Sequence, residues 1–102
     1  MTQLNLDKNT FGDSKASIFL VEELNRLNDI KLSKKLSRFI THFNCVIKDI
    51  DLKNEKKKDF ILFLIRKFYF DKIDNPEKME FKLPELIKNL LKNYINYRIK
   101  TL

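Results

Sequence analysis

Glycine occurs once and proline twice in the 102 residues of this chain. Tight β-hairpins, phosphate-binding loops and dinucleotide-binding turns need residues with positive φ, which glycine adopts at no steric cost. The chain therefore lacks the residues that a P-loop or a Rossmann turn requires. Because 43% of its residues are nevertheless apolar, the expected fold class is all-α, with amphipathic helices that share one core.

Four segments carry apolar residues at the spacing of three and four that is typical of amphipathic helices. We expect these helices over residues 14–28, 32–48, 55–71 and 84–100. Residues 71–83 hold Pro76 and are followed directly by Pro84, and they are expected to form a structured loop. The sequence thus predicts a compact antiparallel bundle of four main helices, forming a single domain over residues 13–102. A short N-terminal arm over residues 1–12 precedes it.

The expected core combines the inward faces of the last three helices. On the third helix we expect the inward face to follow the spacing from Ile61 to Phe68. The predicted core residues are Leu36, Phe39, Ile40, Phe43, Ile61, Leu64, Ile65, Phe68, Ile87, Leu90, Leu91 and Tyr94.

The third helix also carries a second apolar seam, formed by Phe63 and Phe70, which are seven residues apart. A helix that touches only one neighbouring layer does not need apolar residues on two sides. We expect the seam to be covered, either by Leu4, Leu6 and Phe11 of the arm or by a second copy of the chain. If nothing in the chain covers it, Phe63 and Phe70 are the predicted anchors of a partner site.

The nucleophilic and metal-ligating residues are few, because the chain has one cysteine and one histidine. These cannot form an internal disulfide or a four-ligand zinc site, so no metal and no cofactor are expected. His42, Cys45 and Asp49 occupy neighbouring positions on one helix. Catalytic cysteine and histidine residues usually come from separate elements that enclose an oxyanion hole, so we expect no enzyme and no small-molecule substrate.

The positive charge is unevenly distributed along the chain, which has 21 Lys and Arg against 14 Asp and Glu. The net charge is +5 over residues 31–48 and +4 over residues 81–102, whereas residues 1–30 are net negative. A row of cations on a helix can follow the phosphates of a nucleic acid, but it can also be an ordinary solvated face. The candidate nucleic-acid-binding residues are Lys31, Lys34, Lys35, Arg38, Lys88, Lys92 and Lys100.

The longest uncharged apolar run covers only residues 60–65, so no membrane span is expected and the predicted location is cytoplasmic. In overall plan the chain resembles bacteriocin immunity proteins, small helical subunits of CRISPR effector complexes and phage-encoded inhibitors. That resemblance is architectural and implies no functional residues. We expect a small basic protein that acts by binding, as an inhibitor, immunity protein or adaptor. The favoured partner is a protein or a second copy of the chain, and the alternative is a nucleic acid or a ribonucleoprotein complex.

Overall fold

The computed structural model describes residues 8–50, 53–79 and 81–102. Every regular element within these residues is a helix, which confirms the all-α prediction. The single-turn helix α1 is followed by four main helices, as predicted. The elements are α1 (Lys8–Phe11), α2 (Lys15–Leu27), α3 (Ile30–Lys48), α4 (Glu55–Asp74) and α5 (Glu85–Lys100).

Side-chain caps set the beginnings of three of these helices. Ser14, Asp29 and Asn54 each accept a hydrogen bond from the backbone amide three residues later, at 3.0–3.2 Å. Asn28, in the left-handed conformation with φ 52°, ends α2 directly before the cap of α3. Because Asp29 is the cap, α3 begins two residues earlier than its apolar stripe suggests.

Two further boundaries differ from the prediction. Helix α4 continues to Asp74, three residues beyond its expected end, and the expected loop is correspondingly shorter. Helix α1 adds one turn within the segment expected to be an arm. Phe11, the last residue of α1, is buried in the core, so the expectation that it covers the seam on the third helix is wrong. Leu4 and Leu6 lie outside the described residues.

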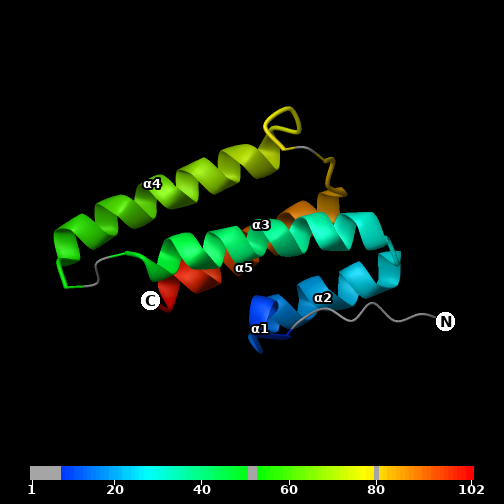
Figure 1. Ribbon diagram of the computed structural model, residues 1–102, viewed down its shortest axis with the longest axis horizontal. Coiled ribbons are helices and arrows are strands. Elements are labelled where there is room, and N and C mark those ends of the chain that lie inside the picture. The colour runs from blue at the N-terminus through cyan, green and yellow to red at the C-terminus, as the bar shows by residue number, and fades with distance from the viewer. Residues whose placement is uncertain (1–7, 51–52, 80) are drawn as a thin grey trace.

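Figure 1 shows how the four main helices are arranged, with α3 passing in front of α5. Helix α5 packs against α2 on one side and against α4 on the other. Helix α1 packs against α3 and α2. Helix α4 forms one edge of the molecule, so the side turned away from the bundle has no neighbour among the described helices (Figure 1). None of these helices combines the length and the apolar character that crossing a bilayer requires.

The predicted core is confirmed for α3 and α5 and only partly for α4. Six of the twelve predicted residues are fully buried, and Phe39, Ile65 and Leu90 are partly buried against the same cluster. The predictions for Leu64 and Phe68 are wrong, because their side chains are 46% and 52% exposed. The six buried residues are Leu36, Ile40, Phe43, Ile87, Leu91 and Tyr94.

Helix α4 buries a face that lies one residue further along the chain than expected. Leu62 and Tyr69 are buried, whereas we expected Ile61 and Phe68. One residue turns a helix by about 100°. A shift of one residue therefore moves the expected inner face to a flank of the helix. The reason is that Tyr69 packs edge-on against Phe39 and its hydroxyl group reaches a partner on α3.

Candidate functional site

The side of α4 that faces away from the bundle is lined with large apolar side chains. Phe60, Phe63, Leu64 and Phe68 are all exposed. We call these four residues the outer face of α4. They are spaced three, one and four residues apart, so they share one side of the helix. Of these four residues, the sequence analysis identified only Phe63 as a candidate for binding. It assigned Leu64 and Phe68 to the core, and it assigned Phe60 neither to the core nor to the apolar seam.

The two residues of the predicted seam, Phe63 and Phe70, differ in exposure. Phe63 is 58% exposed, so no described residue covers it. Phe70 is partly buried against the core, and the Lys92 ammonium lies 5.7 Å from the centre of its ring. Phe63 is thus the more exposed of the two predicted anchors, and both rings line one shallow pocket on this flank of α4.

The cationic edge of α3 is exposed as the sequence predicts. Lys31, Lys34, Lys35 and Arg38 all have exposed side chains. Lys35 also approaches a loop aromatic, with its ammonium 5.8 Å from the ring centre of Phe81. None of these four cations forms an ion pair within the part of the chain that the structure describes.

A groove of about 380 Å³ runs beside this edge, between α3, the C-terminal half of α4 and the following loop. It adds Lys72 and Lys78, which the sequence prediction missed, to Lys35 and Arg38. No acidic residue is among the described residues that line it, although Lys78 pairs with Asp71 at its edge. The remaining lining residues are Phe39, His42, Tyr69, Met79 and Phe81.

The candidate cations on α5 do not join this groove. Lys92 pairs with Asp74 at 2.6 Å, and Lys88 lies 3.8 Å from the carboxylate of Glu85. Lys100 is exposed near the end of α5, beside a pocket that α4 and α5 share. The seven predicted cations thus form separate groups, of which only the group on α3 borders a groove with further cations.

His42 of α3 and Tyr69 of α4 meet where they line the groove. The Tyr69 hydroxyl and His42 Nδ1 are 2.7 Å apart in a hydrogen bond. Burial raises the pKa of Tyr69 to about 12, with a smaller contribution from Cys45, so the phenol is neutral at physiological pH. Cys45 itself is exposed. Among the described residues, no three His, Cys, Asp or Glu side chains gather in a way that could hold a metal ion.

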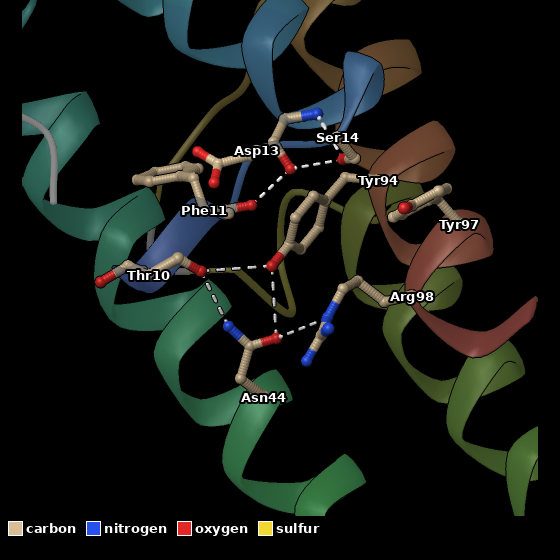
Figure 2. A pocket seen from close by; sticks show the side chains of 10 residues that line it. Thr10, Phe11, Asp13, Ser14, Asn44, Tyr94, Tyr97 and Arg98 are labelled. Carbon is tan, nitrogen blue, oxygen red and sulfur yellow. Dashed lines mark hydrogen bonds between the residues drawn. The ribbon is translucent and has the colours of Figure 1, made fainter. Parts of the chain in front are cut away.

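A second pocket, of about 400 Å³, is lined by a hydrogen-bond network at the end of α1 (Figure 2). Asn44 Nδ2 donates to the carbonyl of Thr10 at 2.9 Å, and the Tyr94 hydroxyl lies 3.2 Å from the same carbonyl. Arg98 Nε donates to Asn44 Oδ1 at 3.3 Å, and Ser17 Oγ donates to the carbonyl of Phe11.

Carbonyl groups at a helix end have no partner within the helix. The network in Figure 2 supplies such partners, so its polar side chains already serve to hold α1 against α3 and α5. This role is structural, and the pocket is a weaker candidate for function than the outer face of α4 or the groove beside α3.

Comparison of the chain with protein-family models, with curated proteins and with solved structures finds no match.

Proposed function

We propose that this chain is a non-enzymatic binding protein whose partner is another protein chain, and that the partner covers the outer face of α4. The observation that carries the proposal is the exposure of four large apolar side chains on one side of this helix. Monomeric proteins rarely expose contiguous apolar patches of this kind, and larger ones mark sites of interaction. An amphipathic helix that presents such a stripe is a common mode of protein recognition.

Substitution of Leu64 with lysine tests this proposal. A charge in the middle of the outer face should abolish partner binding, because a buried and unpaired ammonium is costly to desolvate. In an extract of source cells that were treated with a chemical crosslinker before lysis, so that weak complexes are retained, the wild-type chain should elute in a complex larger than its own 12.3 kDa. The Leu64→Lys variant should elute as the free chain when detected by antibody after size-exclusion chromatography.

Leu86→Lys is the matched control, because Leu86 on α5 is 50% exposed and Leu64 is 46% exposed. Neither substitution fills or empties the core, so both variants should keep the circular dichroism of the wild type. The proposal is wrong if Leu64→Lys elutes with the wild type, or if Leu86→Lys disrupts the complex equally.

The alternative function is binding of a nucleic acid or a ribonucleoprotein, and one specific observation favours it. The groove beside α3 combines Lys35, Arg38, Lys72 and Lys78 with the exposed ring of His42 and the partly exposed rings of Phe39 and Phe81. Cations that neutralise phosphates and rings on which bases stack are the two components of single-strand binding surfaces. Since the groove and the outer face of α4 are formed by different residues, the two functions can be tested independently.

A further inference from the structure

Five of the exposed residues of α4 are arranged symmetrically about Leu64, which is one of them. Phe60 lies four residues before it and Phe68 four residues after it. Lys57 lies seven residues before it and Asp71 seven residues after it. At 3.6 residues per turn, steps of four and seven residues turn a helix by only about 40° and 20°. All five side chains are exposed, so they form one narrow stripe about 20 Å long with opposite charges at its two ends.

We infer that the protein partner is a second copy of this chain, with two α4 helices packed antiparallel about a two-fold axis at Leu64. This inference rests on the proposed function of the outer face. The axis sets Leu64 against its own counterpart and Phe60 against the partner subunit's Phe68. It also sets Lys57 opposite the partner subunit's Asp71, and each contact occurs twice, as an isologous interface requires.

The charges at the ends of the stripe select the antiparallel direction. A parallel pair would set Lys57 against Lys57 and Asp71 against Asp71, which is repulsive at both ends. Within one chain, Asp71 accepts a hydrogen bond from Lys78, which holds the pKa of its carboxyl group below the ordinary value. The group is therefore ionised at neutral pH. A carboxylate has about four acceptor positions, so Asp71 can also accept from a lysine of the partner subunit.

The dimer is expected to be weak. One pair of helices buries less than the ~1,600 Å² that is standard for stable complexes, and each chain carries a net charge of +7. We expect a dissociation constant of about 1 to 100 μM, which corresponds to the low end of specific association. The apolar contacts supply the attraction, and the two charge pairs set the direction and register.

Charge reversal in the purified full-length chain tests the arrangement by sedimentation velocity. Lys57→Asp alone or Asp71→Lys alone should weaken the dimer roughly tenfold, because each sets two like charges opposite each other. The double variant, and an equimolar mixture of the two single variants, should regain the wild-type affinity. In both cases every position 57 again faces an opposite charge at position 71.

Lys34→Asp on α3 controls for net charge. It lowers the net charge by the same amount as Lys57→Asp, and Lys34 is exposed on a helix outside the proposed interface. Repulsion between whole chains would make both variants bind more tightly, so weakening by Lys57→Asp alone identifies a local contact.

Two results would overturn the inference. One is a wild-type chain that stays monomeric up to roughly 500 μM, well above the expected dissociation constant. The other is a dimer that neither the double variant nor the mixture restores. Both leave the proposed function standing if Leu64→Lys still releases the chain from a larger complex in the cell extract. After the first result, the outer face would bind a different protein. After the second, two copies would associate in another arrangement.

Discussion

Replacing Tyr69 with alanine is expected to lower the free energy of unfolding by about 3 to 5 kcal/mol, which is typical of a buried aromatic side chain. Tyr69 is 1% exposed and packs edge-on against Phe39 and Phe43, with ring centres 5.2 and 5.0 Å apart. Its truncation would leave a cavity between α3 and α4 and would remove the hydrogen bond to His42. In a domain of marginal stability this loss approaches complete unfolding.

Alanine at the adjacent residue, Phe68, should lower the free energy of unfolding much less than alanine at Tyr69. Phe68 is half exposed, and its ring contacts Tyr69 and the Lys72 ammonium, 4.3 Å from the ring centre. We expect Phe68→Ala to lower the free energy of unfolding by about 1 kcal/mol, because half of the ring is already in water. Urea unfolding of both variants measures the difference. Equal losses would mean that the orientation of α4 described here is wrong.

Reversing the charge of Lys31, Lys35 and Arg38 to glutamate gives the second large effect, on polyanion binding. If the groove beside α3 binds nucleic acid, the wild type should retard DNA or RNA at low salt. With about four phosphate contacts its affinity should fall by roughly 100-fold between 50 and 200 mM salt. The triple variant should bind weakly at every salt concentration and keep its fold, because single exposed charges contribute only about 0 to 1 kcal/mol to stability.

Glutamate at Lys15, Lys48 and Lys56 is the control for this variant. These three lysines are also exposed but do not line the groove, and their reversal changes the net charge equally. The control should retain most of the affinity for nucleic acid. A wild-type chain that retards no nucleic acid at low salt rejects this alternative, and equal losses in both triple variants reject the groove as its site.

The sequence was sufficient to predict the four main helices, because their caps and apolar spacing are local signals. Ser14 and Asn54, for example, are of the residue types that commonly cap helices, and both act as caps. The stripe of α3 is apolar on one side only, so its buried face could be predicted from the spacing. Helix α4 carries apolar residues on all sides, and its spacing alone does not indicate which side is buried. The contact that decides it joins Tyr69 to His42, 27 residues earlier in the chain.

In the candidate sites, too, residues that are neighbours in sequence could be predicted, whereas residues brought together by helix packing could not. The cationic edge of α3 is continuous in sequence and could be found, whereas Lys72 and Lys78 reach the groove only through the packing of α4 against the bundle. Phe60, Leu64 and Phe68 become a candidate surface only once Tyr69 is known to face inward. Phe11 is the one apolar residue between Leu6 and Ala16, and only the fold shows that it belongs to the core.

A photoreactive amino acid at position 64 tests the proposal that the outer face of α4 is the binding surface. The side chain is replaced by a photoreactive group in the source cells, with position 86 as the control of similar exposure. Irradiation should give a crosslinked product from position 64 and none from position 86. A product of twice 12.3 kDa identifies a second copy, and another mass identifies a different protein. No product from position 64, or equal products from both positions, would contradict the claim.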